Sequence, residues 1–262
     1  MPGPPVLLAV AHGSRDPRHA QTMRALVRRV RARRPGLRVE LGFLDFDAPS
    51  VGGALAALAR EARRAGPRPA AGTGAVVAVP LLLNRAFHAK ADLPAVLRQA
   101  PPELRIEQAG VLGPAPLLLR ALERRLYEAG LPPGDLSSTG VVLASAGTSD
   151  PEANAVIAAI AREWRHTGWC AVRPSFASSP AGRGGAPPGR RGPVQAGDGT
   201  AAAVRGLRAL GCARVAVAPY VLAPGVLPDR IVRGAAEADV VAPVLGDAPE
   251  VADLVLRRFD QA

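Results

Sequence analysis

The sequence predicts an α/β protein made of two tandem, pseudo-symmetric domains, each a parallel sheet covered by helices. Short apolar runs typical of buried strands alternate with longer stretches that have helical periodicity, and this alternation is typical of parallel βα units. A similar order of segments then occurs a second time, after residue 139. The chain has 262 residues, 48% hydrophobic and 21% charged, so it is long enough for one or two globular domains.

The first half, predicted as a domain over residues 1–130, contains four strand–helix pairs. Its first strand is the apolar run Val6 to Ala11, which ends at a turn. Asp16 and Pro17 then provide a helix N-cap and a proline at the first helical position. We expect strands near residues 6–11, 38–44, 74–83 and 104–111, and helices near 17–34, 50–65, 90–99 and 115–129.

The second half, predicted as a domain over residues 139–262, repeats four segments of the first. "LLAVAHGSRDP", which ends at Pro17, corresponds to "VVLASAGTSDP", which ends at Pro151, an offset of 151 − 17 = 134 residues. The segments around the third strand and before the last helix also have counterparts, in the same order. This shared order favours a tandem duplication over two unrelated domains with a similar rhythm.

Three chemically active residues each follow a predicted strand of the first half: His12, Asp45 and His88. The carboxyl ends of parallel strands lie at one edge of the sheet, so these side chains can converge. Two imidazoles and a carboxylate that leave coordination positions open are typical of a site that exchanges a divalent metal. The second half has lost all three, and the corresponding residues are Ala146, Ser178 and the apolar segment near Leu227.

The segments "AHGSRDP", "FLDFDAPS" and "VPLLLNRAFHAKADLP" resemble the signatures of the sirohydrochlorin chelatase family, the class II tetrapyrrole chelatases. The resemblance covers nearly the whole chain, because the long members of that family are also tandem duplications with a degenerate half. It implies that His12 and His88 are catalytic and bind metal, and that Asp45 is a third metal ligand. The family more often has Glu at the position of Asp45.

The reaction implied by this resemblance is ATP-independent insertion of Fe²⁺ or Co²⁺, with Ni²⁺ as a further candidate, into sirohydrochlorin, in siroheme or cobalamin biosynthesis. The pyrrolic N–H protons must leave as the metal enters, and a neutral imidazole can accept a proton near pH 7. The metal is therefore a substrate. No Walker or dinucleotide-binding glycine motif is present, so we expect no nucleotide.

Sirohydrochlorin is a planar polycarboxylate, so cations and N–H donors should orient it. The helix N-terminus after Asp16 is one candidate anion site. A wide macrocycle also needs surfaces on both faces, so we expect the two domains to face each other across a cleft that holds it. The candidate substrate-binding residues next to the two histidines are Ser14, Arg15, Asn84 and Arg85.

The remaining histidines, cysteines and loops have ordinary structural interpretations. His19 and His166 have polar helical neighbours and are expected at the surface. Cys170 and Cys212 are isolated in the sequence without metal-type spacing, and are expected to be buried free thiols. Residues 178–199, rich in Gly, Pro and Arg, are expected to form a mobile surface loop.

The formal charge of +11 does not by itself indicate nucleic acid as a partner. The arginines are scattered and are not interleaved with aromatic residues, as single-strand binding would require. We find no segment with the length of a signal peptide or a membrane span, so we expect a cytoplasmic protein without membrane or nucleic-acid partners. A monomer is expected, with a dimer as the alternative. A non-enzymatic metal or tetrapyrrole carrier of the same fold remains the alternative function.

Overall fold

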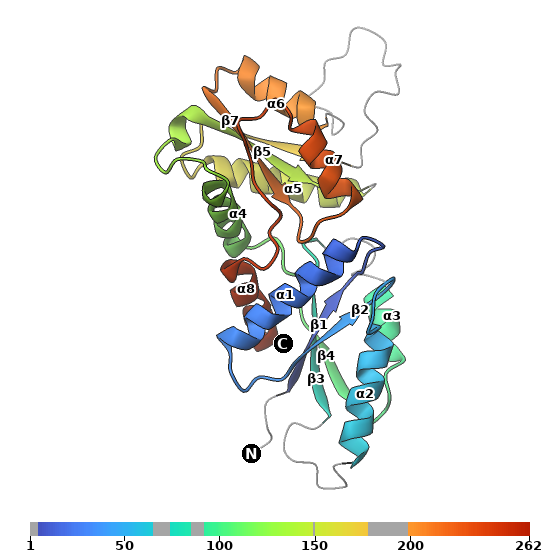
Figure 1. Cartoon of the computed structure of the whole chain (residues 1–262). Helices are drawn as coiled ribbons and strands as arrows, with labels where there is room; N and C mark the ends of the chain where they lie inside the picture. Colours follow the sequence, from blue (N-terminus) through green and yellow to red (C-terminus); the bar gives the residue numbers. More distant parts are fainter. Residues whose placement is uncertain (1–4, 65–73, 85–91, 149, 178–198) are drawn as a thin grey trace, which may run out of the picture. The chain divides into compact units, whose positions relative to one another are not determined.

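The computed structural model describes residues 5–64, 74–84, 92–148, 150–177 and 199–262 (Figure 1). The chain forms two compact units, Met1–Leu118 together with Gly246–Ala262, and Leu119–Leu245. Each unit contains a four-stranded sheet in which all described pairings are parallel. The predicted α/β fold with two parallel sheets is therefore confirmed.

The sheet of the first unit has the order β2-β1-β3-β4. Because all its strands are parallel, the loops that follow them emerge at one edge. Its strands are β1 (Val6–Ala11), β2 (Val39–Phe43), β3 (Ala75–Pro80) and β4 (Arg105–Gln108). Its helices are α1 (Pro17–Arg33), α2 (Val51–Arg64), α3 (Leu93–Arg98) and α8 (Pro249–Asp260).

The predicted elements of the first half agree with these bounds to within a few residues. The largest differences are of three residues. β3 and β4, predicted to continue to residues 83 and 111, end at Pro80 and Gln108, and α3, predicted near 90–99, begins at Leu93. The last ladder pair joins Val10 to Pro80, and the partner strand β1 ends one residue later. β3 is therefore shorter than its apolar run because the neighbouring strand β1 ends at Ala11.

Both faces of the first sheet are covered by helices. Leu8 and Val10 of β1 pack in one core with Leu55 of α2 and Leu93 of α3. Strand side chains alternate between faces, so Leu7 points to the opposite face, where α1 and α8 lie side by side (Figure 1). Because both faces are covered, β1 is apolar and buried along its whole length.

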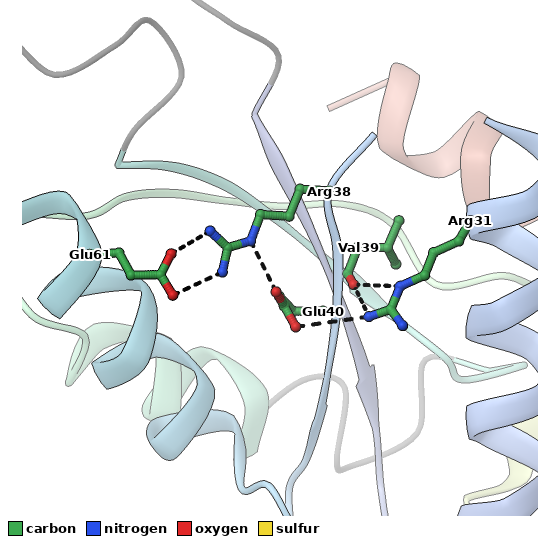
Figure 2. A network of polar contacts seen from close by, with 5 residues as sticks. All are labelled: Arg31, Arg38, Val39, Glu40 and Glu61. Carbon is green, nitrogen blue, oxygen red and sulfur yellow. Dashed lines mark hydrogen bonds and ion pairs between the residues drawn. The ribbon is translucent and has the colours of Figure 1, made fainter. Parts of the chain in front are cut away.

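A network of charged side chains covers the outer edge of β2 (Figure 2). Arg31 on α1 donates to the backbone carbonyl of Val39 through its Nε at 3.0 Å. Arg38 donates through Nε to Glu40 at 3.0 Å and through its terminal nitrogens to Glu61 on α2, which lowers the pKa of the Glu61 carboxyl. The occupied carbonyl of Val39 and the fixed charges beside it disfavour pairing of another strand with β2.

The second unit repeats this topology, with its sheet in the order β6-β5-β7-β8. Each strand thus has the position of its counterpart in the first unit, which supports the duplication inferred from the sequence. Its strands are β5 (Thr139–Ser145), β6 (Ala171–Phe176), β7 (Arg214–Tyr220) and β8 (Val240–Val241). Its α-helices are α4 (Pro116–Glu128), α5 (Pro151–Arg165), α6 (Thr200–Ala209) and α7 (Val226–Gly234). The first residues of α4 belong to the first unit. A short 3₁₀ helix, η2 (Leu136–Ser138), precedes β5.

The two units are each completed by the last helix of the other repeat. Most of α4 belongs to the second unit, where Glu123 accepts a hydrogen bond from the indole N–H of Trp164 on α5 at 2.9 Å. In the first unit, Arg258 of α8 donates to the backbone carbonyls of Val111 at 2.8 Å and Leu112 at 3.1 Å. The predicted ranges 1–130 and 139–262 follow chain order, so the compact units do not coincide with them.

The two cysteines, isolated in the sequence, lie together in the second unit. Their sulfur atoms are 3.5 Å apart, and both thiols are free. The missing side chain of Gly140 on β5 makes room for them, because a Cβ there would lie 2.7 Å from Cys212 Sγ. Cys212 is buried as expected and burial raises the pKa of its thiol to about 11, whereas Cys170 is only partly buried.

Within the described part of the chain, no helix is long and apolar enough to cross a membrane. The segment predicted as a mobile loop, 178–199, lies outside the described residues except for Gly199.

We expect the exchanged helix to contribute measurably to the stability of the first unit. Arg258→Met leaves two carbonyls of buried residues without a donor, so it should lower the free energy of unfolding by about 1–3 kcal/mol in urea denaturation. Arg257→Met, at the exposed neighbouring position, is the matched control and should change it by less than about 0.5 kcal/mol. Equal stabilities of the two variants would contradict this role of Arg258.

Candidate functional site

The first loop of the candidate site follows β1. His12 is the first residue after the strand and is partly buried. The chain then turns at Gly13, whose φ of +95° is in the left-handed region that favours glycine. Asp16 caps α1 by accepting from the backbone N–H of Arg18 at 3.0 Å, as predicted, and Ser14 Oγ accepts from the N–H of Asp16 at 3.1 Å. The loop is thus a short turn with its own hydrogen bonds.

The second loop, residues 44–50, follows β2 and lies directly against the first. The backbone N–H of Leu44 donates to the carbonyl of Ala11, and that of Asp45 to the carbonyl of His12, both at 2.9 Å. A Cβ on Gly13 would lie 1.8 Å from the carbonyl oxygen of Asp45, so only glycine allows this approach. The backbones of His12 and Asp45 are therefore held together at one edge of the sheet.

Asp47 and Arg24, which the sequence interpretation passed over, fix the second loop in place. Asp47 Oδ2 accepts from the backbone N–H of Ser14 at 3.0 Å. Arg24 on α1 donates to the carbonyl of Ala48 at 3.1 Å, and its guanidinium carbon lies 5.8 Å from the centre of the Phe43 ring. The sequence signal that could have identified Asp47 is the second acid of "DFD", residues 45–47. Its carboxylate binds the neighbouring loop.

His19 is half-buried, so the prediction that it lies at the surface is wrong. Its ring centre is 6.4 Å from that of Phe43, and its Nδ1 has no hydrogen-bond partner among the described residues. Burial lowers the pKa of His19 below its ordinary value, nearby His12 lowers it further, and Asp47 opposes both. His19 lies one helical turn before Met23, a buried residue, and this spacing could have indicated burial.

The predicted anion site at the start of α1 is largely occupied by the protein itself. Asp16 accepts from the N–H of Arg18 and forms an ion pair with the Arg18 guanidinium at 2.6 Å. These contacts lower the pKa of Asp16. A carboxylate already fills the first turn, so a substrate carboxylate has less to gain from the helix N-terminus.

The third predicted component of the site lies only partly within the described residues. Asn84, four residues after β3, has a buried Oδ1 that accepts no hydrogen bond from the described residues. Arg85 and His88 lie outside the described residues. Across the described ranges no group of three His, Cys, Asp or Glu side chains could hold a metal ion. The set of His12, Asp45 and His88 therefore remains a prediction.

In the second unit, the positions that correspond to the predicted site are apolar. Ala146 follows β5 and packs, with Leu227 of α7, against the core formed with α6. Neither can bind a divalent ion through its side chain. Ser178, the counterpart of Asp45, lies outside the described residues.

Fold and site together define a two-unit α/β protein with a polar site at the carboxyl edge of its first parallel sheet. The model of the CbiX family matches residues 6–129 and 196–262. The chain therefore belongs to the CbiX family.

Two curated relatives have similar sequences. The sirohydrochlorin ferrochelatase of Bacillus subtilis (strain 168) is 28% identical over 158 residues, 59% of this chain and 56% of the relative. The sirohydrochlorin cobaltochelatase of Priestia megaterium is 29% identical over 178 residues, 65% of this chain and 54% of the relative. The chain thus spans about half the length of each curated relative that it matches.

Solved structures show the same fold. SirB from Bacillus subtilis with Fe³⁺ has a TM-score of 0.73 at 23% identity, covering 99% of this chain and 95% of SirB. CbiX, described as the terminal enzyme for biosynthesis of siroheme in denitrifying bacteria, has a TM-score of 0.62 at 20% identity, covering 98% and 99%. These structures confirm the predicted fold, and the match to the CbiX model confirms the predicted family.

Gly13→Ala should destabilise the first unit strongly, because the added Cβ combines an unfavourable φ with a collision against the carbonyl of Asp45. We expect a loss of at least about 2 kcal/mol in the free energy of unfolding. Gly36→Ala is the matched control, since Gly36 has a φ of +87° but nothing within 4 Å of an added Cβ. If both variants lost the same stability, the contact between the loops would contribute nothing.

The lowered pKa of His19 predicts that stability falls on acidification. In the unfolded chain His19 binds a proton near pH 6.5, whereas in the folded chain it does so only at a lower pH. The free energy of unfolding therefore decreases as the pH falls from above 6.5 toward the lowered pKa of the folded chain. His19→Gln should therefore lose less stability than the wild type between pH 7.5 and 5.5, measured by thermal unfolding. His166→Gln, at an exposed position, controls for the removal of one imidazole. Parallel pH profiles of wild type and His19→Gln would refute the prediction.

Proposed function

We propose that this protein inserts a divalent metal ion, Fe²⁺ or Co²⁺, into sirohydrochlorin without ATP. The observation that carries the proposal is the position of His12 at the carboxyl edge of the first sheet, hydrogen-bonded through its backbone to Asp45. The curated relatives, a sirohydrochlorin ferrochelatase and a sirohydrochlorin cobaltochelatase, support the choice of substrate and reaction. Ni²⁺, which binds similar ligands, is a further metal to test.

In this proposal, His12 and His88 share the two tasks of metal insertion. Metal entry displaces the pyrrolic protons, and a neutral imidazole near its pKa can accept one of them or hold the ion. Asp45 is exposed, and its Oδ1 accepts from the N–H of Phe46 at 2.8 Å. Its Oδ2 then remains for the metal. A site that must release the ion to the macrocycle should hold it through few protein ligands, because a fully coordinated ion would not be released.

The substrate carboxylates are assigned to the side chains around this edge. Arg15 is exposed and forms no ion pair with any described residue, so its charge is available to a ligand. Asn84 can donate to a carboxylate only through its amide nitrogen, because its buried side-chain oxygen, which the described residues leave without a donor, is itself an acceptor. Ser14 Oγ already accepts from Asp16, so only its hydroxyl proton remains to donate. Arg85 completes the set by its position in the sequence.

Replacing the proposed catalytic residues should separate their roles. His12→Ala and His88→Ala should each lower the rate of metal insertion by about 100-fold or more, since each removes a proton acceptor and a ligand. Asp45→Asn should cost about tenfold, and Asp45→Glu should retain most activity because the longer acid can also bind metal. The measurement is the absorption change during anaerobic incubation of sirohydrochlorin with each metal alone.

The same assay distinguishes the alternative function. Near-normal turnover in both histidine variants would refute the assignment of the site. Binding of sirohydrochlorin and metal by the wild type without turnover would instead identify a carrier of the same fold.

A further inference from the structure

The second loop of the site exposes one large aromatic side chain. Phe46 is 53% exposed, although aromatic residues make up only 3% of the sequence. It follows Asp45 directly, so it lies at the same edge of the sheet as His12. An exposed apolar ring of this size gains nothing from the core, and the fold does not require it there.

The backbone of Phe46 is also in an unfavourable conformation. Its φ is +61°, and it is the one non-glycine residue with positive φ in the described parts of the chain. A bulky L-residue is disfavoured in this region, whereas glycine adopts it readily. The N–H of Phe46 donates to Asp45 Oδ1 at 2.8 Å, and the N–H of Asp47 to the carbonyl of Asp45 at 2.7 Å, which holds the turn. Strained residues of this kind cluster at active sites and ligand-binding segments.

Arg15 lies against this ring. Its guanidinium carbon is 5.3 Å from the ring centre, within the range of a cation–π contact. Several other arginines of the first unit are engaged by acidic groups, as Arg38 is by Glu40 and Glu61 (Figure 2), and Arg24 donates to a backbone carbonyl. Arg15 has no such acid among the described residues. A cation and an aromatic surface are thus placed together, three residues from His12, and both face solvent.

We infer that Phe46 and Arg15 form a platform that binds the flat face and one rim carboxylate of a planar polyanionic macrocycle. The inference rests on the proposed function, in which that ligand is sirohydrochlorin. The Phe46 ring stacks on the conjugated ring, and Arg15 pairs with a carboxylate at its edge. Stacking beside Asp45 holds the centre of the macrocycle near the metal ligands, so the platform contributes binding and orientation, and no chemistry.

The test is steady-state metal insertion with varied sirohydrochlorin, together with anaerobic titration of the metal-free ligand. Phe46→Ala should raise KM and Kd for sirohydrochlorin about tenfold with kcat changed less than about twofold. Phe46→Tyr should restore both constants, and Phe46→Leu should fall between them. The KM for the metal should not change. Leu210→Ala, which also removes an exposed apolar side chain, is the control.

A second pair of variants tests whether the two side chains act together. Arg15→Met should also raise KM for sirohydrochlorin, and the double variant should lose less than the product of the single losses, because the ring and the cation bind as one unit. Independent losses that simply multiply would overturn a shared platform.

The Phe46→Gly variant separates an effect on sirohydrochlorin binding from a loss of folding. Phe46→Gly suits the positive φ, so it should be at least as stable as the wild type and still bind sirohydrochlorin weakly. Unchanged Kd in Phe46→Ala and Phe46→Gly overturns the platform while leaving the proposed function intact, provided that the wild type inserts metal. If the wild type binds sirohydrochlorin through Phe46 but inserts no metal, the platform stands and the proposed reaction fails. A change of oligomeric state without a change in Kd would make Phe46 an interface residue and refute the inference.

Discussion

The hydrogen bond from the backbone N–H of Asp45 to the carbonyl of His12 is the contact on which the candidate site depends. It continues the pairing of β1 and β2 beyond the two strands, so the loops that follow them touch. This approach is sterically open only because residue 13 is glycine. Once the loops touch, Asp47 can reach the backbone of Ser14, and Phe46 can lie beside the first loop. The proximity of the His12 and Asp45 backbones thus follows from this backbone contact.

The two repeats separate what the fold needs from what the chemistry needs. In the first unit Ser14 Oγ accepts from the N–H of Asp16, and in the second Thr148 Oγ1 accepts from the N–H of Asp150 at 3.2 Å. Both acids cap the following helix, so the turn is retained as a requirement of folding. The histidine before the turn is not retained, since packing around the turn does not require an imidazole.

The net charge of the chain is a poor guide to its binding surface. Arg31 and Arg38 close the edge of β2, where their guanidinium groups are used by a carbonyl and by carboxylates (Figure 2). Arg258 serves the packing of an exchanged helix in the same way. Arg15 differs because its contact is an aromatic ring that is itself exposed. Which arginine meets a ligand is therefore decided by local contacts, and the total charge says little about it.

The sequence by itself determined the α/β fold, the order of the elements, the duplication and the position of His12 and Asp45 after neighbouring strands. These follow from local hydrophobic patterns, caps and the parallel arrangement, all of which are encoded over short stretches. Only the tertiary structure decided the exchange of α8 and the exposure of Phe46 beside Arg15. Each depends on which distant segment packs against a residue, and no local pattern specifies that partner.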